Sequence, residues 1–326
     1  MKYTHLTKDE RYHIDELLRE GTSASSIAKE LGRSASTLSR ELSRNQGKRG
    51  WRPRQAGLKA VERLSKRGSN NVRRINQLSW AYAKKKLTEE QWSPEQIAGR
   101  LKVEGLSGIS HETIYQRILA DKKSGGSLRQ HLRCQKLRKK RYGSVSRAGR
   151  GCIPDRVDIE QRPAIVDSRD RIGDWEGDTI IGRHDGGAVI ASMVERKSRF
   201  TVLAKSKDKT TKSVISEINI QMSGFSAIVE TVTFDNGKEF SAHKQLSDAL
   251  AADVFFARPY HSWERGLNEN TNGLVRQYLP KKTSFDDIDD SKVQNIAEKL
   301  NNRPRKCLDY KTPTEVLRKL TENLVS

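Results

Sequence analysis

Residues 173–180 read Gly-Asp-Trp-Glu-Gly-Asp-Thr-Ile, and there the pattern of apolar side chains changes from a helical period to the short runs typical of strands. A first strand is predicted at 174–181, with a turn at 184–187 after it. The remaining predicted elements are strands at 188–195 and 200–205, a helix at 213–222, a strand at 229–234, a helix at 243–250, a strand at 254–256 and a helix at 267–278. This order predicts a mixed α/β sheet flanked by helices, with functional groups at strand ends.

Three carboxylates stand out in this half of the chain. Asp178 lies inside the first predicted strand, Asp235 ends the fourth, and Glu269 begins the last predicted helix. Taken alone, Asp235 can start an Asp-Asn-Gly turn and Glu269 can stabilise a helix N-terminus. Asp178 is harder to explain in this way, because a carboxylate among apolar strand residues is costly without a partner.

Brought together, the three carboxylates would repel one another unless a cation neutralised them. Their oxygen ligands suit a hard divalent cation, which predicts Mg²⁺ or Mn²⁺ and most simply two ions. Two such ions can serve an in-line phosphoryl transfer, in which water or a DNA 3′-hydroxyl attacks a phosphodiester. Glu176 shares a strand face with Asp178 and is a rival ligand.

The charge of the 326-residue chain is unevenly distributed. Residues 1–150 hold 35 Lys and Arg against 14 Asp and Glu, whereas residues 151–326 hold 27 of each. All of the net charge of +21 therefore lies in the first half, which favours nucleic acid as a polyanionic partner. A solvated basic tail is the alternative, but the helical patterning of this half favours nucleic-acid binding.

The first 50 residues predict a helix-turn-helix unit. Thr7 and Glu10 form a capping box for a first helix, a short helix follows at 25–31, and a third is predicted at 35–44. The third helix is predicted to contact DNA through outward polar side chains: Ser36, Thr37, Ser39, Arg40 and Arg44. An ordinary small helical bundle with a polar face is the alternative.

Residues 91–125 repeat this pattern in a shorter form. Ser93, Pro94 and Gln96 predict the start of one helix, and Ser110 predicts the start of another at 111–119. The second helix is predicted to contact DNA through Thr113, Gln116 and Arg117. A plain helical linker is the alternative.

Two basic segments separate these units. Residues 51–90 predict a basic helical linker, part of which follows the DNA backbone. A flexible basic linker is predicted at 126–165, because 129–150 holds nine Lys or Arg and no acidic residue. The predicted domains are therefore 1–50, 51–90, 91–125, 126–165 and 166–326.

Composition excludes several classes of protein. No apolar run approaches the roughly 18 residues needed to span a bilayer, and residues 1–20 lack the pattern of a secretory signal. Cys134, Cys152 and Cys307 are too few and too scattered for a disulfide framework or a CxxC zinc site. We expect a protein of a reducing cytosol with no membrane partner.

Three segments of the second half carry a resemblance to a known family. Residues 173–180, 234–240 (Phe-Asp-Asn-Gly-Lys-Glu-Phe) and 263–273 (Trp-Glu-Arg-Gly-Leu-Asn-Glu-Asn-Thr-Asn-Gly) resemble the signatures of bacterial DDE transposases, and of the IS-thirty insertion-sequence family in particular. The closing segment from Leu300 to Pro313 is similar to that of the family, as are residues 31–34 and 92–98. The resemblance covers almost the whole chain.

The resemblance implies a ribonuclease-H-like, integrase-type catalytic core with a metal-binding triad of Asp178, Asp235 and Glu269. It ranks Glu176 below Asp178 as a ligand, and it implies that a basic residue two turns after the glutamate, here Arg276, faces the same DNA. Two positions depart from the family pattern. Lys282 and Asp309 stand where glycine is expected, which concerns the local loop geometry and lies outside the triad.

These observations lead to a sequence-specific DNA transposase. We expect the helical units to bind the terminal inverted repeats of a mobile element, and the acidic core to cleave the element ends and join them to target DNA. The family implies a homodimer or a larger homo-oligomer on DNA. Two alternatives remain: a DNA-binding regulator whose core no longer catalyses, and a nuclease that cuts without joining.

Overall fold

The computed structural model describes residues 5–69, 76–106, 108–133, 153–183, 187–258, 261 and 266–325, without the side chains of 65–69 and 323–325. The chain divides into two compact units, residues 1–75 and 76–326. The boundary falls inside the segment predicted as one basic linker, so each unit takes one part of it. Residues 134–152 of the predicted flexible linker at 126–165 lie outside the described residues.

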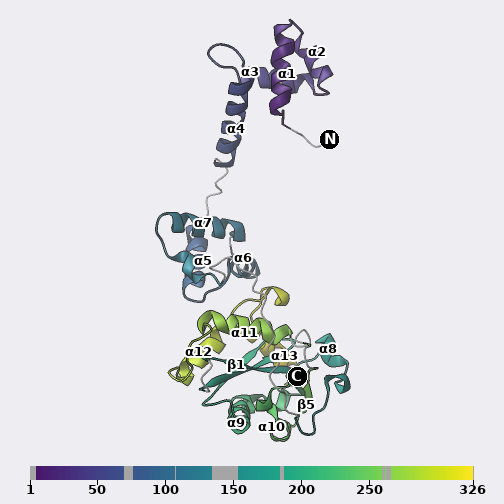
Figure 1. The fold of residues 1–326 in the computed structure, drawn as a ribbon, viewed down its shortest axis with the longest axis vertical. Coiled ribbons are helices and arrows are strands. Elements are labelled where there is room, and N and C mark those ends of the chain that lie inside the picture. Colours follow the sequence, from purple (N-terminus) through teal and green to yellow (C-terminus); the bar gives the residue numbers. More distant parts are fainter. Residues whose placement is uncertain are drawn as a thin grey trace. The chain divides into compact units, whose positions relative to one another are not determined.

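The first unit is helical (Figure 1). Its helices are α1 (Lys8–Arg19), α2 (Ala24–Glu30), α3 (Ala35–Arg44) and α4 (Pro53–Ser69). The predicted capping box starts α1: the Glu10 amide donates to Thr7 Oγ1 at 3.1 Å, and the Thr7 amide donates to Glu10 Oε2 at 2.6 Å. Ile14, Ile27 and Leu38 form the small core that joins α1, α2 and α3. The helix-turn-helix fold predicted from the capping and apolar spacing is confirmed.

The second unit begins with three helices, α5 (Gln77–Thr88), α6 (Pro94–Val103) and α7 (His111–Lys123). The predicted capping box of α6 is present, with the Ser93 amide donating to Gln96 Oε1 at 2.8 Å and the Gln96 amide donating to Ser93 Oγ at 3.3 Å. Helix α7 starts at the predicted residue but continues past residue 119, and the chain turns at Gly125, whose φ is 83°.

A five-stranded sheet follows, in the order β3-β2-β1-β4-β5. Its strands are β1 (Asp174–Ile181), β2 (Val189–Glu195), β3 (Thr201–Ser206), β4 (Thr231–Phe234) and β5 (Asp253–Phe256). The first three strands pair antiparallel, whereas β4 and β5 run parallel to β1. This order confirms the ribonuclease-H-like core that the resemblance implies.

Helices cover both faces of this sheet (Figure 1). On one face lie α9 (Thr211–Met222) and α10 (His243–Leu250), and on the other α11 (Gly266–Tyr278) and α12 (Asp290–Asn301). Helix α8 (Ile165–Ser168) precedes the sheet, and α13 (Pro313–Val325) packs against α12. Short 3₁₀ helices lie at Leu128–His131, Ile159–Gln161, Ser223–Ile228, Lys238–Phe240 and Lys306–Leu308. None of the described helices is long and apolar enough to cross a membrane.

Alternation along the strands sends neighbouring side chains to opposite cores. Val189 and Met193 of β2 pack with α9 and α10, whereas Ile190 packs with α11 and α12. On β1, Trp175 joins the first of these cores and Ile180 the second. Even-numbered residues of β1 therefore face α11, and that face carries the predicted acidic residues.

Helix α6 packs against the C-terminal part of the same unit. The Arg100 guanidinium donates to both carboxylate oxygens of Glu315, at 2.7 and 2.6 Å. Close by, a Cβ built on Gly99 would lie 2.2 Å from the ring of Tyr310. Glycine is therefore required at residue 99, because any side chain there would collide with an aromatic ring.

The two departures from the family's glycine pattern have the backbone that glycine favours. Lys282 has φ 75° and Asp309 has φ 53°. Both angles lie in the left-handed region, which costs an ordinary residue roughly 1 to 2 kcal/mol. The left-handed backbone explains why glycine is expected at these two positions. This chain keeps that backbone although neither residue is glycine.

Candidate active site

Asp178 lies on the face of β1 that α11 covers. Its Oδ1 accepts a hydrogen bond from the Thr179 amide at 2.8 Å, and its Oδ2 accepts one from Asn272 Nδ2 at 2.9 Å. Asn272 is oriented in turn by Ser192 of β2, whose hydroxyl donates to Asn272 Oδ1 at 2.8 Å. Strand β2 and helix α11 together hold this carboxylate in one orientation.

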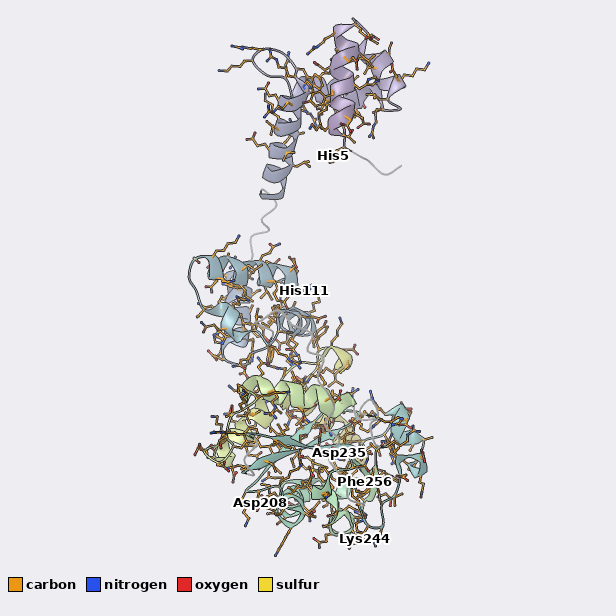
Figure 2. The ribbon with its side chains drawn as sticks, viewed as in Figure 1. His5, His111, Asp208, Asp235, Lys244 and Phe256 are labelled. Atoms are coloured by element: carbon orange, nitrogen blue, oxygen red, sulfur yellow. The ribbon has the colours of Figure 1, made fainter. Side chains whose placement is uncertain are left out.

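Asp235 directly follows β4, the strand next to β1 (Figure 2). The parallel ladder pairs Glu176 with Thr233, and Asp178 and Asp235 each lie two residues further along their strands. Since period-two alternation continues, the two aspartates point to the same side of the sheet. Asp235 Oδ1 also accepts from the Gly237 amide at 2.9 Å, which is the turn role considered for it.

Glu269 lies in the first turn of α11 and is exposed. It precedes Asn272 by three residues, so the helix that carries it is the one that contacts Asp178. Within the described part of the chain, no three Asp, Glu, His or Cys side chains lie close enough to form a metal site. The structure thus places Asp178 and Asp235 on one face with Glu269 on the helix above, but it does not close the three into a ligand set.

The chemistry of these donors fits a hard divalent cation. All of them are carboxylate oxygens, and no histidine or thiol takes part, which is the ligand type of Mg²⁺ and Mn²⁺. Three like charges without a cation repel one another, and this favours separation of an exposed Glu269 from the two aspartates. The triad and its two ions stay a prediction at this point.

Glu176, the rival ligand on the same strand face, has a structural role. Its side chain is 1% exposed, and its Oε1 accepts from Arg196 at 2.7 Å, while its Oε2 accepts from the amide of Asn268 at 3.3 Å. Burial lowers the pKa of Arg196, and the charge of Glu176 opposes this effect. A carboxylate already paired with a buried guanidinium is a poor candidate for a metal ligand.

Arg276 is engaged inside the protein. Its guanidinium donates to the carbonyl of Ile181 at the end of β1, and it lies 5.8 Å from the ring centroid of Phe285. Burial lowers the pKa of Arg276. These contacts tie α11 to β1, a role that the helical spacing from Glu269 did not reveal; contact of Arg276 with DNA stays a prediction.

The predicted recognition helix α3 presents its polar side chains to solvent. Ser36, Ser39, Arg40 and Arg44 are exposed. Thr37 differs, because it is half-buried and its hydroxyl lies 2.8 Å from that of Ser34, the residue that caps the helix. The arrangement suits DNA contact by the exposed residues, with Thr37 occupied at the helix start.

On α7, the predicted DNA-contacting residues lie in different surroundings. Gln116 is exposed, and Thr113 is half-buried with its hydroxyl 2.8 Å from that of Ser110. Arg117 was expected to face outward, but it is half-buried and its guanidinium lies 4.6 Å from the ring centroid of Trp80. This correction has a physical cause, since a guanidinium gains by stacking on an indole face.

The contacts of Asn272 and Ser192 were not predicted. Asn272 lies within the asparagine-rich run at 268–272, and its spacing from Glu269 was the available signal. Ser192 carried no such signal, because a serine on a buried strand becomes informative only when its partner is known.

Comparison with known proteins adds to this geometry. A family model described as a helix-turn-helix domain matches residues 2–45. The catalytic core domain of BIV integrase is a similar solved structure, with a TM-score of 0.37 and 19% identity, covering 47% of this chain and 99% of that one.

Two similar relatives extend over nearly the whole chain. The transposase for insertion sequence element IS4351 of Bacteroides fragilis is 40% identical, over 97% of this chain and 96% of the relative. Transposase InsI for insertion sequence element IS30A of Escherichia coli (strain K12) is 35% identical, over 96% of this chain and 83% of the relative. With relatives this similar along their own length, the chain belongs to the IS-thirty (IS30) family of insertion-sequence transposases.

Proposed function

We propose that this transposase cleaves the ends of its insertion sequence and joins them to target DNA in a metal-dependent reaction carried by Asp178, Asp235 and Glu269. The observation that supports this most is the position of the two aspartates. Asp178 lies two residues after Glu176 of β1, and Asp235 lies two residues after its paired residue on the parallel strand β4. Both aspartates lie on the face of the sheet that is covered by the helix carrying Glu269.

The reaction consists of two phosphoryl transfers. In the first, water attacks a phosphodiester at the element end, one P–O bond forms, and the bond to the departing 3′-oxygen breaks. In the second, the freed 3′-hydroxyl attacks a phosphodiester of the target, and the target strand leaves through its own 3′-oxygen. A divalent cation held by the carboxylates supplies stabilisation of the negative charge that develops on the reacting oxygens.

The protein side chains supply orientation. Asn272 and the Thr179 amide hold the Asp178 carboxylate, and the Gly237 amide holds that of Asp235. A carboxylate held in this way loses less conformational entropy when it binds a cation, because its rotamer is already selected. Glu269 completes the set in this proposal when its exposed carboxylate is drawn toward the two aspartates by the cation.

The test uses the full chain and a duplex that carries the element end. Asp178→Asn, Asp235→Asn and Glu269→Gln are each expected to reduce cleavage and strand transfer by several orders of magnitude, with either Mg²⁺ or Mn²⁺. Their losses are not expected to add, because the three act as one unit. End binding should persist in all three variants.

Asp248→Asn and Glu298→Gln are the matched controls, because both residues are exposed on helices of the same core. The controls should match wild type. If the triad variants also match wild type, the metal-triad proposal is wrong. If wild type binds ends without cutting them under any metal, the inactive regulator is favoured, and cutting without joining favours the nuclease.

We also propose double-stranded DNA as the partner, for both element ends and target, with the exposed face of α3 as the base-contacting surface. Joining two ends requires two active sites, so a homodimer or larger homo-oligomer is expected on DNA, in the cytoplasm and near the nucleoid. Light scattering of the protein with and without end DNA measures this. A single copy on a paired-end complex would contradict it.

A further inference from the structure

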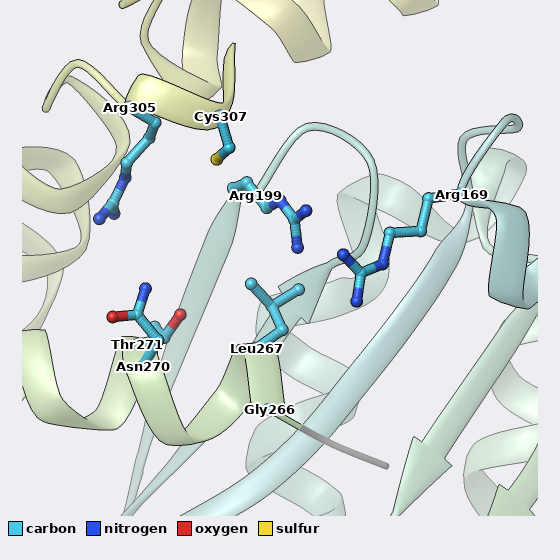
Figure 3. A pocket seen from close by; sticks show the side chains of 8 residues that line it. All are labelled: Arg169, Arg199, Gly266, Leu267, Asn270, Thr271, Arg305 and Cys307. Atoms are coloured by element: carbon cyan, nitrogen blue, oxygen red, sulfur yellow. The ribbon is translucent and has the colours of Figure 1, made fainter. Parts of the chain in front are cut away.

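A cavity of about 320 Å³ opens beside the start of α11 (Figure 3). Residues of α11, among them Leu267, Asn270 and Thr271, form one of its walls. Asn270 directly follows Glu269, so the cavity and the predicted triad share the first turn of one helix. A ligand in this cavity would therefore lie next to the proposed active site.

Three arginines from separate segments line the rest of the cavity. Arg169 follows α8, Arg199 lies in the turn between β2 and β3, and Arg305 follows α12. Figure 3 shows the side chains of Arg169 and Arg199 extended toward one another above Leu267, with Arg305 directed at Asn270 and Thr271. No acidic residue is among the described residues that line this cavity.

The arginines keep unused hydrogen-bond donors. The Nε atoms of Arg199 and Arg305 are buried and have no hydrogen-bond partner in the described part of the chain, and Arg305 is only 9% exposed. Burial, followed by the neighbouring charge of Arg303, lowers the pKa of Arg305 to about 10. Buried donors on charged groups are costly when they are left unpaired.

Arginines elsewhere in this unit are paired differently. Arg196 is bound to Glu176 and Arg100 to Glu315. Not every buried arginine of the unit has a carboxylate partner, since Arg303 donates to Gln277 and Tyr278. The cavity differs in gathering three guanidinium groups with no acidic residue among the described residues that line it. An anion from outside the chain would supply the negative charge that this lining lacks.

The backbone angles of two of these arginines also indicate a binding site. Arg169 has φ 59° and Arg199 has φ 65°, the left-handed region that arginine seldom adopts. Strained positions persist where the surrounding structure requires them, and they cluster at binding sites. Here the strain directs two guanidinium groups into one cavity.

We propose that this cavity binds a backbone phosphate of the DNA on which the enzyme acts. Guanidinium groups recognise phosphate oxygens with paired hydrogen bonds, and Asn270 and Thr271 supply further polar contacts. The bound phosphate holds the DNA strand beside Glu269. The identity of the anion as DNA rests on the proposed function, whereas the anion site rests on the cavity itself.

Cys307 lines the cavity and provides a probe of the free protein. We compare alkylation of Cys307 by the anion iodoacetate with that by neutral iodoacetamide, using mass spectrometry of its peptide. Both reagents react with the thiolate, so the rate with iodoacetate divided by the rate with iodoacetamide does not depend on how much thiolate is present. This ratio therefore reports how strongly the cavity attracts an anion. Inorganic phosphate at constant ionic strength should lower the ratio in wild type. Arg169→Asn with Arg199→Asn removes two charges and should lower it at least about fivefold, since one charge at ~4 Å in water has that effect.

Asparagine is chosen because it tolerates left-handed backbone. The double variant should melt no lower than wild type, since two like charges are removed. Arg318→Gln is the matched control, because Arg318 is exposed on α13 and pairs with Glu322 away from this cavity. An unchanged alkylation ratio in the double variant, with no effect of phosphate on wild type, would overturn the anion site.

Binding of an element-end duplex over a range of salt concentrations tests the DNA assignment. The slope of log K against log salt should become shallower by about 0.9 for each phosphate that the double variant no longer neutralises, and it should stay unchanged in Arg318→Gln. If phosphate competes at Cys307 but the slope does not change, the cavity is a free-phosphate site and the DNA assignment is wrong. Neither readout needs cleavage, so a wild type that fails to cut would defeat the proposed function and leave this inference standing.

Discussion

The side-chain amide of Asn272 on α11 donates a hydrogen bond of 2.9 Å to the carboxylate of Asp178 on β1. This contact joins the helix that carries Glu269 to the strand that carries Asp178. It therefore sets the position of one predicted ligand relative to another, although Asn272 itself has no charge with which to hold a cation.

The first prediction concerns this contact. Asn272→Ala should lower the cleavage rate by about 10- to 100-fold, the usual cost of removing a group that orients a metal ligand. The concentration of Mg²⁺ for half-maximal rate should rise at the same time, which a general loss of folding would not produce. Ser192→Ala removes the bond that orients Asn272 and should give a smaller change in the same direction. Equal Mg²⁺ dependence in all three proteins would refute this role.

The second prediction separates the two acidic residues that share a face of β1. Glu176→Gln leaves the buried charge of Arg196 with only the more distant and exposed Asp167, at 3.6 Å, and should lower the free energy of unfolding by about 3 kcal/mol. Asp178→Asn keeps the hydrogen bond from the Thr179 amide but loses the one from Asn272, because an amide nitrogen cannot accept it, and it should cost at most about 1.5 kcal/mol. Urea unfolding without metal measures both. A larger loss for Asp178→Asn would reverse the structural assignments made here.

The third prediction uses two helical glycines. Gly57 in α4 has open space around it, so Gly57→Ala should stabilise the first unit by about 1 kcal/mol, the difference in helix propensity. Gly99 in α6 lies under the Tyr310 ring, so Gly99→Ala should destabilise the second unit despite the same gain in propensity. Thermal unfolding of the full chain distinguishes them. A stabilising Gly99→Ala would mean that Tyr310 does not lie against α6.

The fourth prediction concerns the left-handed residues Lys282 and Asp309. Lys282→Gly and Asp309→Gly should each raise stability, by at most about 1 kcal/mol, because they relieve the backbone strain at φ 75° and φ 53° while adding some entropy to the unfolded chain. Lys282→Ala removes the same side chain but keeps the strain, and it should give no gain. Melting temperatures of the three variants decide between strain and side-chain effects.

The fifth prediction concerns the exposed face of α3. Arg40→Ala should cost about 1–3 kcal/mol in binding to the element end, and much less on random DNA if Arg40 contacts a base. Arg19→Ala is the control, because Arg19 is an exposed arginine of α1 that pairs with Asp15. Equal losses on specific and random duplexes would instead assign Arg40 to a phosphate contact.

Local signals in the sequence were sufficient for most of the secondary structure. Capping residues such as Thr7 and Ser93 act within three residues of themselves, so the starts of α1 and α6 could be predicted. Strand β1 was predicted at its observed bounds from the change in the apolar pattern after Gly173, which is a local signal too. Helix ends were predicted less accurately, as in α7, because the length of the last turn depends on the conformation of the residues that follow it.

The sequence by itself determined which acidic residues are candidates, and it left Asp178 and Glu176 as rivals on one strand face. The resemblance ranked Asp178 above Glu176, but only the tertiary structure supplied a physical reason, because Arg196 follows β2 and Asn272 comes from a helix almost a hundred residues away. The same holds for Arg117, which stacks on Trp80, and for the cavity formed by Arg169, Arg199 and Arg305. Which distant residue a side chain contacts depends on how the whole chain packs. The tendency to form a helix or a strand depends on residues that are neighbours in the sequence, so it can be predicted from the sequence alone.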